Sequence, residues 1–183
     1  MIPAFTGILA PHGLATSFES IATVTGTGSS GTVTFSSIPS TYQHLQIRQM
    51  MRTDYAATDI GWIFRFNSDT GNNYSWHSLY GNGTSPVTDY STSVSYVNVG
   101  YGNGSSVAAN TMGVSVVDIL DYASTNKYKT TKALSGNDRN GGGIVTLMSG
   151  CWMSTNAITS ISIIAGAGNF TTSSTFALYG VKA

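Results

Sequence analysis

Every segment of this chain with enough apolar residues to form regular structure has the pattern of a β-strand. From Phe18 onward apolar and polar residues alternate with period two, and the intervening residues are mostly Gly, Ser, Thr and Asn. Only 9% of the residues are charged, Glu19 is the single glutamate, and no apolar repeat has helical spacing. Because Glu, Lys and Leu commonly fill exposed helices, this pattern predicts an all-β chain.

The alternation also shows which side chains share a face. Trp62, Phe64 and Phe66 lie on one side of a strand, and Arg65 and Asn67 lie on the other. The chain has more short expected strands than a single open sheet holds. We therefore predict two antiparallel sheets in a jelly-roll-like β-sandwich, with a closed barrel as the alternative. The expected strands are Phe18 to Thr25, Thr32 to Ser36, His44 to Thr53, Trp62 to Asn67, Ser75 to Tyr80, Val94 to Gly100, Val114 to Leu120, Lys129 to Ser135, Ile144 to Met153, Ile158 to Ile164 and Thr175 to Lys182.

Residues 1–17 have a different character. They are apolar but interrupted by proline and glycine, and no Lys or Arg precedes the apolar run, so the segment matches neither a secretory signal nor a membrane span. We predict an extended N-terminal arm that docks on a partner through Phe5, Ile8 and Leu9, followed by one β-sandwich domain over residues 18–183. The alternative is that the arm frays or folds back over its own sandwich.

Charge and cysteine content narrow the choice of partners and compartment. Eight Lys and Arg balance eight Asp and Glu, and the basic residues are scattered, so neither nucleic acid nor a membrane is an expected partner. Cys151 is the only cysteine and has no partner for an internal disulfide. A β-rich domain without bridges is typical of a reducing compartment, which here suggests assembly in a bacterial cytoplasm.

Two motifs resemble ligand-binding loops. Gly26–Gly31 matches G-x-G-x-x-G, but a strand follows where a dinucleotide site needs a helix, so we expect a hairpin turn. Asn67–Asn73 spaces oxygen-bearing side chains as calcium loops do, yet only Asp69 in it is charged. A type I turn with Asx hydrogen bonds explains that loop without a metal, and we predict no metal site and no cofactor.

No set of side chains predicts catalysis. Asp118 and Asp121 are close in sequence but suit the end of a strand and the start of a turn, and Cys151 lies in the middle of an expected strand, where a buried thiol is the usual role. The imidazoles are His12, His44 and His77. None of them lies beside a serine in a strand–turn–helix elbow, so we assign no catalytic residue and predict that the chain is not an enzyme.

Aromatic residues offer one candidate binding surface. In the segment Tyr74–Tyr80, alternation places Tyr74, Trp76 and Tyr80 on one strand face. Trp76 and Tyr80 could stack on sugar rings and contact a glycan, while packing in a core or an interface is the alternative explanation of the same rings.

Three blocks of the chain carry a resemblance to known proteins. The first covers FESIATVT at 18–25 and VTFSSIPSTYQHLQIR at 33–48, and the second is RFNSDTGNNYS at 65–75. The third comprises AITSISI at 157–163, NF at 169–170 and STFALYGVK at 174–182. Together they span nearly all of the chain after the arm, and they resemble a family of small proteins encoded by tailed bacteriophages, cyanophages among them.

The resemblance implies a virion structural protein, either a capsid decoration (cement) subunit or a module of a tail fibre. Its expected partner is the phage major capsid protein or another virion protein. With few surface charges to resist close packing, we also expect a homo-oligomer, a trimer or a dimer. The chain has no coiled-coil or collagen-like repeat that would form a fibre shaft, which favours the decoration subunit. The alternatives are a tail-fibre or receptor-binding module that recognises a host glycan and, third, a hydrolase.

Overall fold

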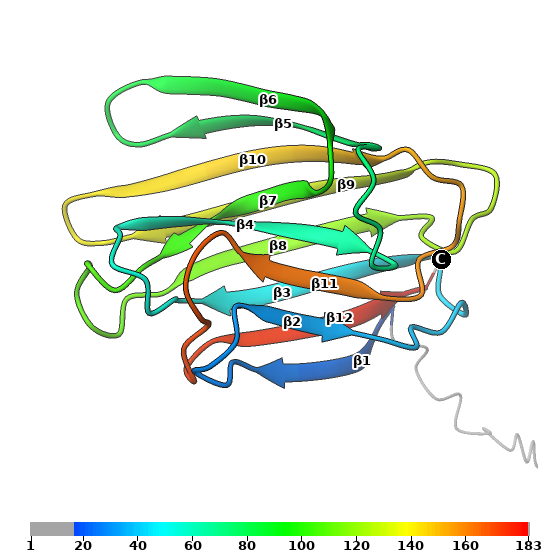
Figure 1. Cartoon of the computed structure of the whole chain (residues 1–183), viewed down its shortest axis with the longest axis horizontal. Coiled ribbons are helices and arrows are strands. Elements are labelled where there is room, and N and C mark those ends of the chain that lie inside the picture. Colours follow the sequence, from blue (N-terminus) through cyan, green and yellow to red (C-terminus); the bar gives the residue numbers. More distant parts are fainter. Residues whose placement is uncertain (1–16, 183) are drawn as a thin grey trace, which may run out of the picture.

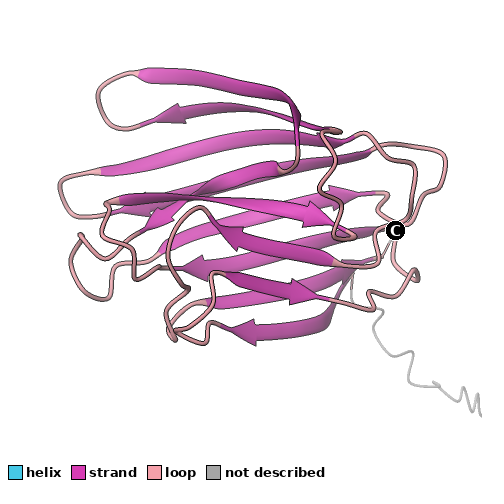
Figure 2. Cartoon of the chain, in the orientation of Figure 1, coloured by secondary structure: helices cyan, strands magenta, loops and turns pink. Residues whose placement is uncertain are grey.

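The computed structural model describes residues 17–182, which form two antiparallel β-sheets (Figures 1 and 2). These residues include no helix, and therefore none with the length and apolarity to cross a membrane. The strands are β1 (Phe18–Thr25), β2 (Thr32–Phe35), β3 (His44–Met51), β4 (Asp59–Phe66), β5 (Tyr74–Gly81), β6 (Pro86–Val94), β7 (Val97–Asn103), β8 (Gly113–Leu120), β9 (Lys129–Asp138), β10 (Gly143–Trp152), β11 (Ile161–Ala165) and β12 (Thr175–Val181).

The pairing of the strands is nested. One sheet has the order β1-β12-β3-β8-β9-β10-β5-β6 and the other the order β2-β11-β4-β7. Thus β1 pairs with β12, β2 with β11, β3 with β8, and β4 with β7. Nested antiparallel pairs arise when one long ribbon of paired strands rolls into two facing sheets, which is the jelly-roll arrangement. The predicted β-sandwich is confirmed, and the closed barrel does not form because each sheet ends in edge strands.

Two hairpins widen the larger sheet beyond this roll. β5 pairs with β6, β9 pairs with β10, and β10 also pairs with β5, so the two hairpins lie side by side. In Figure 1 the β5–β6 hairpin forms the upper border of the molecule. The sandwich therefore has one layer of eight strands and one of four, and its broad layer presents a correspondingly wide outer surface.

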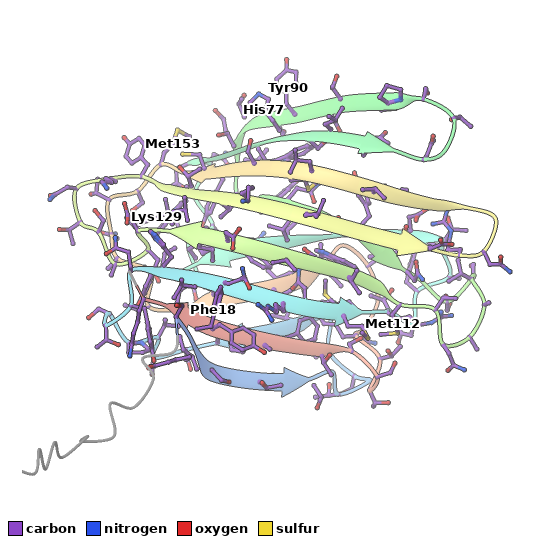
Figure 3. All side chains as sticks on the ribbon, turned by 180° about the vertical axis from the view of Figure 1, so that it is seen from behind. Phe18, His77, Tyr90, Met112, Lys129 and Met153 are labelled. Atoms are coloured by element: carbon purple, nitrogen blue, oxygen red, sulfur yellow. The ribbon has the colours of Figure 1, made fainter. Side chains whose placement is uncertain are left out.

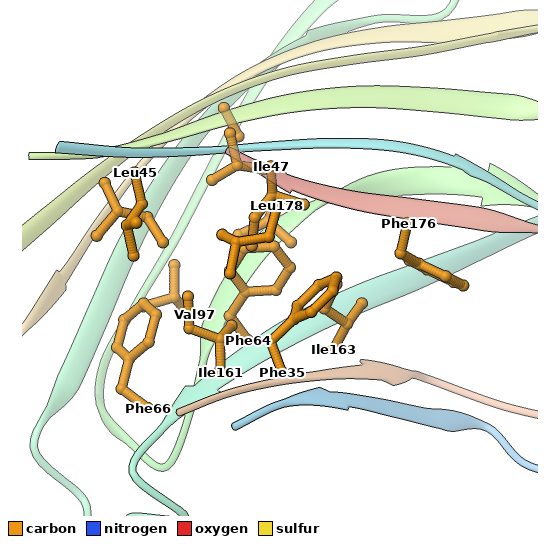
Figure 4. Packing of buried hydrophobic residues seen from close by; sticks show 14 of the residues in the cluster. Phe35, Leu45, Ile47, Phe64, Phe66, Val97, Ile161, Ile163, Phe176 and Leu178 are labelled. Carbon is orange, nitrogen blue, oxygen red and sulfur yellow. The ribbon is translucent and has the colours of Figure 1, made fainter. Parts of the chain in front are cut away.

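The core fills the space between the sheets. Trp62, Phe64 and Phe66 of β4 are fully buried, as their alternation predicts. Phe64 and Phe66 belong to one core cluster with Ile47 and Leu178 of the facing sheet (Figure 4). A buried side chain of this size contributes roughly 1.5–3 kcal/mol relative to an exposed one. The period-two pattern thus fixes both the strand and the side that packs inward.

The glycine-rich segment Gly26–Gly31 is not a hairpin turn. β1 belongs to the eight-stranded sheet and β2 to the four-stranded sheet, so the segment carries the chain from one layer to the other. A Cβ on Gly26 would lie 2.2 Å from the carbonyl oxygen of Thr171, and Gly28 has a φ of 77°. The glycines are needed for close backbone approach and for a left-handed residue at this crossing.

The prediction of a strand over residues 94–100 also has the wrong bounds. β6 ends at Val94 and β7 begins at Val97, and the sequence analysis missed β6 entirely. β6 starts with Pro86 and contains mostly polar residues, which is typical of an edge strand that pairs on one side only. Its sequence therefore lacks the alternating apolar signal of the covered strands.

The predicted docking residues Phe5, Ile8 and Leu9, together with His12, lie outside the described residues.

Candidate interaction surface

The outer face of the eight-stranded sheet, turned away from the smaller sheet, carries a group of exposed aliphatic side chains (Figure 3). Their exposed fractions lie between 40% and 63%. We call this group the central patch. It consists of Val114 and Val116 of β8, Leu134 of β9, Val145 and Leu147 of β10, and Leu79 of β5.

Strand register arranges the patch in rows that cross the strands. Val116 lies opposite Leu134, Leu134 opposite Leu147, and Leu147 opposite Leu79. Directly opposed residues on one face have Cβ atoms about 5 Å apart, so the four side chains form one contiguous strip. Antiparallel registry of four separate segments creates this strip, and no single segment reveals it.

A second row beside it is flatter. Val114 lies opposite Gly136, Gly136 opposite Val145, and Val145 opposite Gly81. The two glycines alternate with the two valines and add no side chain above the sheet. The row therefore leaves room for a partner's side chains to approach the backbone.

The row on the other side of the strip is polar but electrically balanced. The ammonium nitrogen of Lys132 lies 3.3 Å from a carboxylate oxygen of Asp118, and the side-chain amide of Gln46 donates a 2.8 Å hydrogen bond to the other oxygen. At the far end of the same row the rings of His77 and Tyr90 stack with centroids 5.6 Å apart. This flank can accept polar contacts without presenting an unpaired charge.

Another cation on this side of the sheet, Arg48, lies over aromatic rings. The guanidinium of Arg48 is 5.5 Å from the ring centroid of Phe18 and 5.1 Å from that of Tyr179. Such cation–π contacts are worth about 0.5–1 kcal/mol at exposed sites. These contacts cover part of the Arg48 side chain and part of the Phe18 ring, at the edge of the face where β1 lies.

A shallow hollow of about 510 Å³ lies between β5, β6 and β10. Its lining includes Leu79 and Leu147 from the central patch, and Lys132 and Tyr90 from the polar row. Most of the lining surface is apolar. The hollow thus extends the central patch toward the edge strand β6.

The predicted glycan residues point the other way. Trp76 is only 7% exposed, and Tyr80 is half-buried with its ring 6.2 Å from that of Tyr101. Alternation did place Trp76 and Tyr80 on one strand face, but that face turns inward, and His77 and Leu79 occupy the outer one. The ring of Trp76 is therefore not available as a stacking surface.

The loop 67–73 uses its carboxylate internally. Asp69 accepts hydrogen bonds from the Gly71 amide at 2.8 Å, from the Asn73 side chain at 2.9 Å and from the Trp152 indole at 2.8 Å. The bond from Asn73 has the largest effect in holding the pKa of Asp69 below its ordinary value, with those from Gly71 and Trp152 adding to it. The expected Asx hydrogen bonds are confirmed.

The turn type in this loop differs from the expectation. Asn67 and Ser68 both have positive φ, and the Asp69 amide donates to the Phe66 carbonyl, as in a type I′ turn rather than type I. The turn orients Asp69 toward Trp152, which the sequence spacing did not indicate. Among residues 17–182 no three His, Cys, Asp or Glu side chains gather as metal ligands would.

The other candidate reactive groups are held by hydrogen bonds or partly buried. The Asp121 carboxylate accepts from Lys127 and Gln43, and the first of these bonds contributes most to lowering its pKa. Nδ1 of His44 accepts a 3.0 Å hydrogen bond from the backbone amide of Asp121. Burial raises the pKa of the Cys151 thiol, which disfavours the reactive thiolate.

Comparison with protein-family models, curated proteins and solved structures gives no match to this chain.

Proposed function

We propose that this chain is a structural subunit of a tailed-phage particle, a capsid decoration protein that adds cohesion by packing the outer face of its broad sheet against a neighbouring subunit. The observation that carries this proposal is the row of Val116, Leu134, Leu147 and Leu79, which the strand register aligns across four strands. Contiguous exposed apolar surface on a folded domain marks an interaction site.

The surroundings of the central patch support the same function. Asp118 and Lys132 neutralise each other beside it, and the chain as a whole has no net charge. Subunits with such surfaces can pack closely in many copies without mutual repulsion. The resemblance to small phage proteins points in the same direction.

The decoration role is preferred over the glycan-binding module because the latter loses its main predicted contact. Trp76 lies on the buried face of β5 and is 7% exposed. The outer positions of β5 belong to His77 and Leu79 instead, and Leu79 contributes to the apolar strip. A subunit that stabilises the particle by packing against a neighbour would use the apolar side chains that are exposed on this face.

Rebinding to particles tests the proposal. Purified chain is added to particles of the encoding phage that lack it, and bound protein is measured after sedimentation. The wild-type chain and Thr34→Lys, which adds a charge to an exposed position of β2 in the other sheet, should both bind. Leu134→Lys/Leu147→Lys should bind at least tenfold less. Failure of the wild-type chain to bind, or full binding by the double variant, would overturn the proposal.

A further inference from the structure

The outer face has the dimensions of a complete protein interface. Eight strands spaced about 4.8 Å apart, each about eight residues long at roughly 3.3 Å per residue, give a face of roughly 900 Å². A stable interface buries about 800 Å² on each partner. The four strands that carry the central patch supply about half of this area, so the occupant must also cover strands on either side.

A second copy of this chain fits that requirement. Its outer face has the same width and length, so one face covers the other, and two sheets pack well face to face at about 10 Å with their strands within about 30° of one another. Leu134 and Leu147 occupy the middle two strands of the patch, so a two-fold axis that passes between β9 and β10 brings them to the centre of the contact. A two-fold contact of this kind closes on itself and leaves no patch uncovered.

Charge is compatible with self-association. Asp118 and Lys132 beside the patch are already paired at 3.3 Å, and Gln46 satisfies the second oxygen of Asp118. Arg48 lies opposite Val116 at the end of the strip, and its guanidinium lies over the rings of Phe18 and Tyr179. The patch itself consists of aliphatic residues, with glycines between the two valines of the second row. Two copies therefore bring apolar rows together, with Asp118 and Lys132 paired beside the rows and Arg48 at their end covered by aromatic rings.

We propose that two copies of this chain form a two-fold dimer by packing their central patches face to face. This inference rests on the proposed function in taking the outer face as the interaction surface, and it names a second copy as the neighbour. The dimer is then the unit that the particle carries. Its contact surface is the broad sheet, and the β2-β11-β4-β7 sheet of each copy faces outward from the pair.

Sedimentation equilibrium of the full chain between 1 and 100 μM tests the dimer. Wild type and Thr34→Lys should sediment as dimers, and Leu134→Lys/Leu147→Lys should raise the dissociation constant at least tenfold. A second double variant, Leu134→Thr/Leu147→Thr, keeps β-forming residues without adding charge and should weaken the dimer in the same direction. Thermal unfolding of each variant shows that it is folded.

Two outcomes overturn the inference. One is a wild-type chain that stays monomeric at 100 μM, and the other is a dimer that both double variants leave intact. If Phe5→Ser/Ile8→Ser/Leu9→Ser dimerises while wild type does not, the N-terminal arm occupies the face instead of a second copy. A monomer that still rebinds to particles through the patch refutes the dimer alone, whereas a dimer that fails to rebind refutes the decoration role alone.

Discussion

Leu134 of β9 lies directly opposite Leu147 of β10 on the outer face, and each side chain is more than half exposed. The inward neighbours Ala133 and Met148 on the same strands are buried in the core. Adjacent positions on these strands thus separate two roles, since one side stabilises the fold and the other remains available for association.

The first prediction concerns this separation of roles. Leu134→Thr should change the free energy of unfolding of the monomer by no more than about 0.5 kcal/mol, because the side chain is exposed. Leu178→Ala, which removes a fully buried side chain, should cost about 2–5 kcal/mol. Urea unfolding at low protein concentration measures both. A large loss for Leu134→Thr would show that the outer face contributes to monomer stability.

A second prediction uses two glycines. A Cβ on Gly102 would lie 1.7 Å from the indole of the fully buried Trp62, so Gly102→Ala should destabilise the fold by about 3 kcal/mol or more. Gly81→Ala is the matched control, because nothing lies within 4 Å of its added Cβ, and it should change stability by less than about 0.5 kcal/mol. Equal thermal midpoints for the two variants would contradict the packing described around Trp62.

The third prediction concerns how the contribution of Asp69 to stability depends on pH. At pH 7 Asp69→Asn should cost about 1–3 kcal/mol, because the charged acceptor of the Trp152 indole is lost. The folded pKa of Asp69 is lowered from 3.8, so this stabilisation is present above about pH 3.8 and is lost as the pH falls through the folded pKa.

The stability difference between wild type and Asp69→Asn should therefore shrink in acid. Asp138→Asn is the control, since this exposed carboxylate accepts only the backbone amide of Asn140, and it should have a small effect at every pH. Chemical unfolding from pH 2 to 7 provides the comparison. A difference that stays constant over this range would show that the Asp69 charge does not stabilise the loop.

The fourth prediction is that calcium does not stabilise this protein. The carboxylate of Asp69 is already bonded to Gly71, Asn73 and Trp152, which leaves no charged ligand in loop 67–73 for the ion. Thermal unfolding with EDTA and with millimolar calcium should give the same midpoint. A midpoint that rises with calcium concentration would reveal a site.

The fifth prediction concerns the arm. Deleting residues 2–14 should leave the sandwich folded, because each described strand begins at or after Phe18, but should lower occupancy on particles. Phe5, Ile8 and Leu9 would each contribute on the order of 1.5–3 kcal/mol to docking before ordering costs are subtracted. Circular dichroism and particle sedimentation measure the two effects. Undiminished binding by the shortened chain would mean that docking uses the sandwich alone.

Much of the fold was predictable because alternation is a local signal. Trp62, Phe64 and Phe66 were placed on one face of a strand, and all three are buried. The edge strand β6 was missed because it needs little apolar content. The crossing at Gly26–Gly31 was taken for a hairpin because glycines serve close backbone approach as well as turns.

The interaction surface was not predictable for a different reason. Alternation shows that Trp76 and Tyr80 share a face, but not that this face turns inward when Leu79 on the opposite face is also apolar. The strip itself depends on which residue of β9 lies opposite Leu147 of β10, and register between strands is a property of the folded sheet. The valines on both faces of residues 114–117, and the adjacent Leu147 and Met148 of β10, were local hints of an apolar outer surface.

A cryo-EM map of the particle of the encoding phage tests the central claim most directly. We expect density for this sandwich on the capsid, with Leu134 and Leu147 of each copy covered by a neighbouring subunit. A particle without this chain, or one in which the outer face of every copy is open to solvent, would contradict it.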